Sequence, residues 1–195
     1  MSADPGAGVT AALLLARWWS RPTGDEQDVW DGLWSQAQQA ARALGCEPDA
    51  IERLRDAAAE GEPDALSDEY ERLLVGPGRA PCLPYESAWG GSTARRPGNG
   101  ELMGAAAEQV QAVYGELGLQ LRTDGHELPD HLVVEWEALA CALERRAPTA
   151  AAFLLDEHLG RWMVPFCAAV AAETELPFYR ELAQITPAWT AALAP

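Results

Sequence analysis

The sequence contains no lysine, and its fourteen basic residues, all arginine, face thirty acidic residues, which gives a formal net charge of −16. Nucleic acid and anionic membrane surfaces both attract basic proteins, so we expect neither as a partner. A Walker A loop needs a lysine that reaches the β- and γ-phosphates, so the Gly-Pro-Gly turn at residues 76–78 does not predict nucleotide hydrolysis. A cationic peptide, in contrast, is attracted to so acidic a protein.

Cysteine is scarce and long hydrophobic runs are missing. The four cysteines lie far apart, at Cys46, Cys82, Cys141 and Cys167. None of their spacings is typical of a metal site or a redox pair, so we expect buried or idle thiols and no metal site. We also expect no bound cofactor. The apolar run 9–16 precedes its nearest arginine, Arg17, whereas a secretion signal has the opposite order. No window approaches the eighteen apolar residues of a membrane span, and we therefore expect a cytoplasmic protein without stable membrane insertion.

β-Branched residues are few, while alanine makes up much of the 48% hydrophobic content. This composition favours helix over sheet and predicts a single all-α domain over 1–195. Apolar residues at helical spacing predict helices over 9–20, from a cap at Asp25 to Gly45, over 48–60, through 66–74, over 102–117, from a cap at Asp130 to 143, from Pro148 through 162, and from Pro177 onward. Pro165 and Pro187 are expected to break or kink the helices that contain them.

One stretch, at about 76–100, has no helical or strand period. It contains six glycines and four prolines, and it also carries large apolar side chains at Leu83, Tyr85 and Trp89. A solvated linker would not contain such residues, so we expect a long ordered loop. The residues alone leave open whether its aromatic side chains fill the core, bind a ligand, or do both.

The same stretch carries a family resemblance. A helix with Glu-Tyr-x-Arg-Leu-Leu at 69–74 leads into Gly-Pro-Gly and then Pro-Tyr-Glu-Ser at 84–87, and Pro-Asp-His-Leu follows at 129–132. Together with the C-terminal segments HLGRWMVPF and LPFYRELAQIT, these blocks resemble the TorD/DmsD family of redox-enzyme maturation chaperones over roughly 70–186. The resemblance implies a helical bundle of the TorD/DmsD type that is not an enzyme. It also implies a cytoplasmic chaperone that binds the twin-arginine signal peptide of a molybdopterin oxidoreductase and assists cofactor insertion before export.

The resemblance also implies which residues bind the peptide. The matching positions are Leu73, Leu74, Gly78, Pro84, Tyr85, Glu86, Asp130 and His131. Leu74 stands where relatives often have phenylalanine, and Leu83 where proline is common, so the shape of the pocket stays open. We expect the two motifs to meet in three dimensions as two walls of one peptide-sized hollow.

Asp130 and His131, with Glu135 one turn further on, also permit other interpretations. A carboxylate that orients a histidine base would suit a hydrolytic or small-molecule-binding domain, but the sequence offers no nucleophile beside it and no third metal ligand. The structural alternative is a helix cap followed by a histidine, and we also interpret His158 as structural. A permanent scaffold subunit is a further alternative. The identity of the client, the formation of a homodimer and weak binding of nucleotide or molybdenum cofactor stay open.

Overall fold

A computed structural model describes residues 5–22, 26–60, 63–76, 80–89, 104–121 and 128–194. Within these ranges the chain forms helices joined by turns, and pairing between extended segments is limited to one isolated β-bridge. The prediction of an all-α, single-domain fold is confirmed. The long loop expected at about 76–100 falls partly outside the described ranges, so its order over its whole length stays a prediction.

The helices follow one another along the chain. Their bounds are α1 Pro5–Trp18, α2 Glu26–Leu44, α3 Pro48–Glu60, α4 Pro63–Tyr70, η1 Glu71–Val75, η2 Glu86–Ala88, α5 Ala105–Glu116, α6 Leu132–Glu144, α7 Pro148–Phe153, η3 Leu154–Leu159, α8 Gly160–Glu173 and α9 Pro177–Leu193. Two of these elements, η1 and η3, are π-helical turns, and η2 is a short 3₁₀ turn. None of the described helices is long and apolar enough to cross a membrane.

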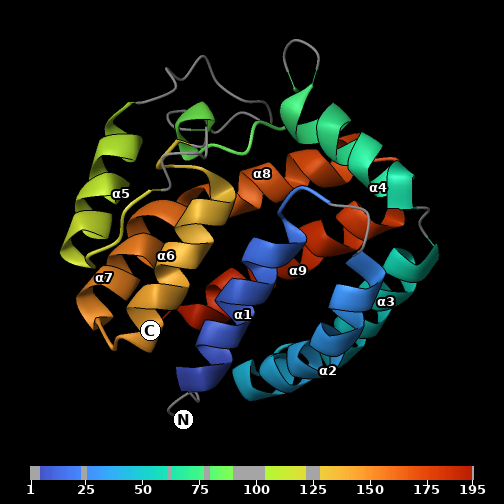
Figure 1. The fold of residues 1–195 in the computed structure, drawn as a ribbon, viewed down its shortest axis with the longest axis horizontal. Coiled ribbons are helices and arrows are strands. Elements are labelled where there is room, and N and C mark those ends of the chain that lie inside the picture. The colour runs from blue at the N-terminus through green and yellow to red at the C-terminus, as the bar shows by residue number, and fades with distance from the viewer. Residues whose placement is uncertain are drawn as a thin grey trace.

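Helix α1 lies in the middle of the bundle, beside α6 and in front of α9, with α2 and α3 on its other side (Figure 1). Its tryptophans account for this position. Trp18 stacks on Trp34 of α2 with ring centroids 5.6 Å apart, and just past the helix end Trp19 lies 5.1 Å from the ring of Phe166 in α8. The Trp19 indole N–H also donates to the Thr186 hydroxyl at 2.9 Å. The N-terminal tryptophans are therefore core residues, as core packing of the first two helices predicts.

Neither interior proline interrupts its helix, so the predicted break at Pro187 is wrong, and at Pro165 a break is wrong while a kink stays a prediction. Helix α8 continues past Pro165, and α9 continues past Pro187 to Leu193. In α9, Thr186 and Thr190 each donate a side-chain hydrogen bond to the carbonyl four residues earlier. Burial of Ile185 and Trp189 on both sides of the proline holds the helix together, so tertiary packing outweighs the local cost of about 3 kcal/mol.

The four cysteines are free thiols, as expected. Cys82 and Cys167 are buried, whereas Cys46 and Cys141 are half-buried. Burial raises the pKa of the Cys82 thiol to about 12 and also raises that of Cys167. Because the thiolate is the reactive form, these two thiols are poor nucleophiles at neutral pH.

Candidate functional site

The two sequence motifs meet where the loop crosses the start of α6. Tyr85 and His131 form the isolated antiparallel β-bridge, in which the Leu132 N–H donates to the Pro84 carbonyl at 2.8 Å and the Glu86 N–H donates to the Asp130 carbonyl at 3.0 Å. The Tyr85 and His131 rings also contact each other edge to face, with centroids 5.2 Å apart. Forty-odd residues of chain thus separate two segments that are held together by backbone hydrogen bonds.

Asp130 and His131 divide their roles differently from the prediction. His131, not Asp130, is the cap of α6, because its Nδ1 accepts a hydrogen bond from the Val133 N–H at 3.2 Å. The Asp130 carboxylate instead reaches back to the loop, where its Oδ2 accepts from the Ser87 N–H at 2.9 Å. Both side chains are buried. The predicted cap is therefore shifted by one residue, and Asp130 fastens the loop.

The loop is also held from the preceding helix. The Cys82 N–H donates to the Leu73 carbonyl at 2.9 Å, within the π-helical turn η1. The side chains of Leu73 and Leu74 are 0% and 2% exposed, so in this conformation they belong to the core and not to an open surface. Gly76 ends the turn at a φ of +65°, a conformation that favours glycine. Gly78 lies outside the described residues.

Glu86 makes a buried contact that the sequence did not reveal. Its Oε2 lies 2.6 Å from Nδ1 of His158, whose side chain is fully buried in η3. The π-helical geometry of η3 needs Gly160, because a Cβ there would lie 2.4 Å from the Leu155 carbonyl oxygen. Wide π turns are frequent at functional sites, and in this protein both of them contact the same loop. The burial of His158 against Glu86 agrees with its interpretation as structural, but the sequence pattern did not identify Glu86 as its partner.

A second buried carboxylate lies close by. Glu135 in α6 is fully buried, and its Oε2 accepts from the Trp162 indole N–H of α8 at 3.2 Å. Burial raises the pKa of Glu135 well above its usual value, and the negative charges of Glu86 and Asp130 raise it further. Near it, Tyr114 of α5 donates to the Pro129 carbonyl at 2.8 Å. The carboxylates of Glu86, Asp130 and Glu135 thus lie close enough to interact, and burial together with the two neighbouring charges favours the protonated form of Glu135.

We expect Glu135→Gln to stabilise the protein above neutral pH. A carboxyl group whose pKa is raised by folding supports stability below its unfolded pKa of about 4.3, and that support is lost as the pH rises through the folded pKa. Glutamine keeps the shape and the acceptor for Trp162 without needing the proton. Urea unfolding at several pH values should show that the variant and the wild type have similar free energies of unfolding near pH 4. As the pH rises, the variant should become increasingly more stable than the wild type. An equal difference at all pH values would contradict the raised pKa.

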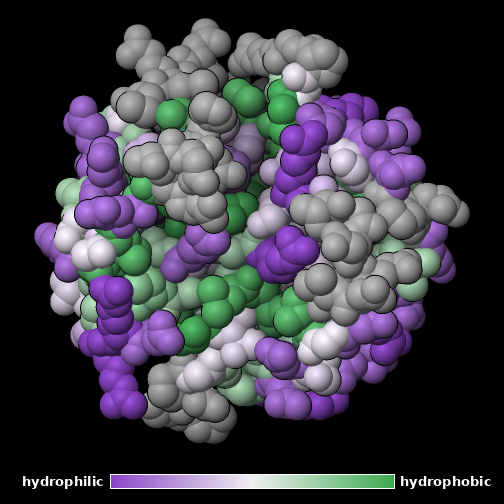
Figure 2. Space-filling view, viewed as in Figure 1, coloured by the Kyte–Doolittle hydropathy of each residue, from purple (hydrophilic) through white to green (hydrophobic). Residues whose placement is uncertain are grey.

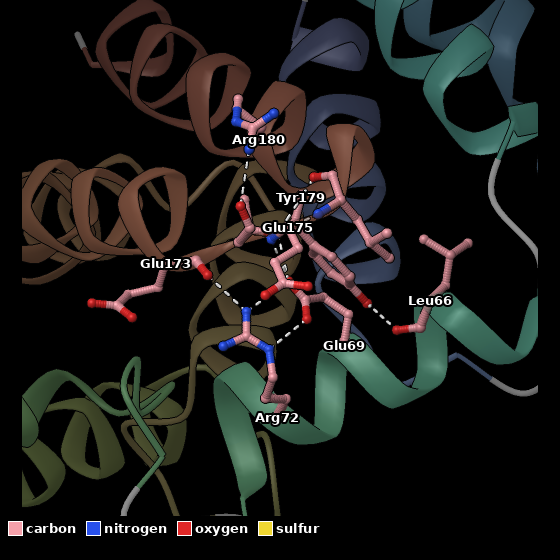
Figure 3. Close-up of polar contacts among 9 residues, drawn as sticks. Leu66, Glu69, Arg72, Glu173, Glu175, Tyr179 and Arg180 are labelled. Carbon is pink, nitrogen blue, oxygen red and sulfur yellow. Dashed lines mark hydrogen bonds and ion pairs between the residues drawn. The ribbon is translucent and has the colours of Figure 1, made fainter.

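A separate polar cluster fixes η1 against the turn between α8 and α9 (Figure 3). The buried Glu69 carboxylate accepts from Arg72 Nε at 2.7 Å, from the Thr174 hydroxyl at 2.8 Å and from the Glu175 N–H at 2.8 Å. Arg72 also donates to the Glu173 carbonyl at 2.7 Å. These bonds hold the segment from which the loop departs, so the family motif Glu-Tyr-x-Arg-Leu-Leu has a clear structural role.

Comparison with known proteins identifies the family of this chain. The model of the nitrate reductase delta subunit family matches residues 45–168, which is more than half of the chain and spans both motifs. The chain belongs to the nitrate reductase delta subunit family. The resemblance to TorD/DmsD proteins is thereby confirmed. In this member of the family, the matched region runs from the end of α2 into α8 and so includes the loop, the α6 cap and His158.

The fold is similar to that of a solved relative. A crystal structure of a proposed redox enzyme maturation protein from Archaeoglobus fulgidus superposes with a TM-score of 0.61, covering 93% of this chain and 91% of the other at 21% identity. A search of curated proteins finds no match. Within the described ranges, no group of three or more histidine, cysteine or acidic residues is arranged to hold a metal ion.

Proposed function

We propose that this protein is a cytoplasmic maturation chaperone that binds the twin-arginine signal peptide of a molybdopterin oxidoreductase of the nitrate reductase type. It retains the precursor until its cofactor is inserted, and it has no catalytic turnover. The observation that carries the proposal is the joining of the two family motifs at the Tyr85–His131 bridge, in a chain whose family model covers both. Peptide binding involves the region around Leu73, Leu74, Gly78, Pro84, Tyr85, Glu86, Asp130 and His131.

The charge of the protein suits such a partner. A net charge of −16 attracts the arginines of a signal peptide from a distance, whereas the apolar segment of the peptide needs a surface to bury against. On the face in Figure 2, hydrophilic side chains dominate the edges and apolar atoms are exposed towards the middle.

The apolar residues of the signal peptide should determine affinity. Each large apolar side chain that becomes buried contributes about 1.5–3 kcal/mol, whereas an exposed arginine–carboxylate pair contributes about 0.2–1 kcal/mol. We therefore expect that replacing two leucines of the signal peptide by serine weakens binding more than replacing both arginines by lysine. Isothermal titration calorimetry with synthetic peptides measures both changes. The opposite order would show that charge dominates.

The proposal itself is tested by titrating the purified protein with the signal peptides of molybdoenzymes encoded beside its gene. A peptide of the same composition in scrambled order is the control. Binding at micromolar or lower concentration by at least one authentic peptide, with much weaker binding of its scrambled form, is the expected result. If no such peptide binds below high micromolar concentration, the proposed function is wrong.

The geometry gives less support to a hydrolytic site at Asp130 and His131. One Asp130 oxygen accepts from the Ser87 N–H, and His131 Nδ1 accepts from the Val133 N–H. Both side chains are buried under the loop, where a substrate would have to displace structural hydrogen bonds. A permanent scaffold subunit would co-purify with the mature enzyme, whereas a chaperone should be found with the precursor.

A further inference from the structure

Helix α8 presents an unusually apolar face to solvent. Its outward residues between the first and last turns are all apolar, namely Val164, Pro165, Ala168, Ala171 and Ala172. Val164 is 60% exposed, the highest value among the exposed large hydrophobic residues of the described ranges. From 164 to 172 the helix rises about 12 Å, which matches roughly two turns of a partner helix. We refer to these five residues as the α8 stripe.

The opposite face of the same helix supports the motif loop. Phe166 packs against Trp89 at the end of the loop, with ring centroids 5.7 Å apart, and Trp162 donates to Glu135. At its C-terminal end, α8 meets η1, where Arg72 donates to the Glu173 carbonyl. Val75, one turn beyond Arg72, is 48% exposed. Helix α8, which carries the stripe, therefore contacts the elements that carry the family motifs.

The two ends of the α8 stripe differ in charge. Glu173 and Glu175 are exposed at the C-terminal end, and among the described residues neither side chain has an ion-pair partner. The nearby Arg72 is paired with Glu69, and the last turn of α8 contains no basic residue. The negative end of the helix dipole adds to these two carboxylates. At the other end, Arg161 pairs with Glu157.

We infer that the α8 stripe is the docking surface for the apolar segment of the signal peptide, with the peptide's arginines at the Glu173–Glu175 end. This inference rests on the proposed function and adds a surface and an orientation to it. The motif residues themselves are largely buried, so they shape the scaffold behind α8, while the exposed stripe makes the contact. Its small alanines permit close approach of a helix backbone, and its lack of any charged residue over 164–172 suits a partner without charges over the same length.

The α8 stripe competes with one alternative apolar surface. Leu13 of α1 is 50% exposed, and Figure 2 shows apolar atoms in the middle of the face on which Figure 1 places α1. However, Arg17 follows one turn later on the same helix, and it is half-buried, so that surface is interrupted by a charged residue. Leu13→Glu is therefore the matched control.

The experiment compares the wild type with Val164→Glu, Ala168→Glu and Leu13→Glu in signal-peptide titrations, after circular dichroism has shown that each variant is folded. Both α8 variants should raise the dissociation constant at least tenfold, while Leu13→Glu should change it less than twofold. Val164→Ser is a milder change at the same position and should weaken binding several-fold. It replaces the glutamate variants in the titrations if they do not fold. The double variant Glu173→Gln/Glu175→Gln should slow association several-fold at low salt and leave dissociation within about twofold.

Each other outcome has a definite meaning. If the wild type binds and the α8 variants bind equally well, the inference is wrong and the proposed function stands. If Leu13→Glu abolishes binding instead, the peptide docks on α1 and the inference is also wrong. If sedimentation shows that the α8 variants disperse a dimer without changing peptide affinity, the stripe is a homotypic interface, which overturns the inference. If the wild type binds no signal peptide, both the proposed function and the inferred docking surface are wrong.

Discussion

Replacing Glu69 by alanine should lower the free energy of unfolding by about 3 kcal/mol, which corresponds to a loss of about 10 °C in Tm for a chain of this length. Glu69 is 7% exposed and accepts hydrogen bonds from Arg72, Thr174 and the backbone of Glu175. Its removal leaves these donors without their acceptor inside the junction of η1, α8 and α9. The Arg72 side chain is 42% exposed, so water partly solvates its guanidinium and keeps the cost from being larger.

Glu71 provides the matched control because it lies two residues later in the same helical segment. Its carboxylate lies 2.6 Å from Arg21, but the two side chains are 34% and 66% exposed. An exposed pair of this kind contributes about 0.2–1 kcal/mol at most, so Glu71→Ala should change stability little. Chemical unfolding monitored by circular dichroism measures both variants. Equal losses for the two variants would show that the buried network around Glu69 contributes nothing special.

The effect of Glu69 should also depend on pH. Burial alone would raise the pKa of Glu69, but the hydrogen bonds from Arg72, the Glu175 backbone and Thr174 outweigh it, and the net direction is downward. A carboxylate with a lowered pKa supports stability above its unfolded pKa of about 4.3 and loses that support as the pH falls through the folded pKa. The difference between wild type and Glu69→Gln should therefore shrink in acid. Glu135 behaves with the opposite sign, so the two variants separate the two carboxylates experimentally.

The helical fold could be predicted well because the spacing of apolar residues and the prolines and glycines at helix ends indicate the same helices. Pro48, Pro148 and Pro177 each open a helix as expected, and Gly45 and Gly76 follow helix ends with positive φ. Local rules failed at Pro165 and Pro187, where packing on both sides holds the helix through the proline. These failures have one cause, namely that tertiary burial outweighs a local preference.

The site was predicted only in part. The two motifs meet as predicted, and this meeting was inferred from their resemblance to the family. The peptide-sized hollow expected between them stays a prediction. The partners of Glu86 and Glu135, in contrast, are His158 and Trp162, which come from elements that follow the motifs in the chain. No helical period relates these pairs. The displacement of the cap from Asp130 to His131 is a matter of one residue, which a sequence pattern does not resolve.

The pair formed by Glu86 and His158 should be the strongest single link between the loop and the bundle. The Glu86 Oε2 and His158 Nδ1 atoms are 2.6 Å apart, and the side chains are 11% and 0% exposed, so the contact has little access to water. Breaking a buried pair by removing one partner costs about 3–5 kcal/mol, because the remaining polar group stays buried without its partner. We therefore expect Glu86→Ala and His158→Ala each to destabilise the protein by about that amount.

A double-mutant cycle separates the pair from the packing of each side chain. If the two groups act on each other, the double variant should be more stable than the sum of the single losses predicts, by about 2 kcal/mol, because the second substitution removes the group that the first left unpaired. Hydrogen exchange then locates the effect. The Ser87 and Leu132 amides, which bond to Asp130 and Pro84, should lose protection in both single variants, while the α9 amides change only with global stability. Strict additivity, with unchanged exchange at Ser87, would mean that the Glu86–His158 pair does not link the loop to the bundle and that the other bonds of the loop hold it in place.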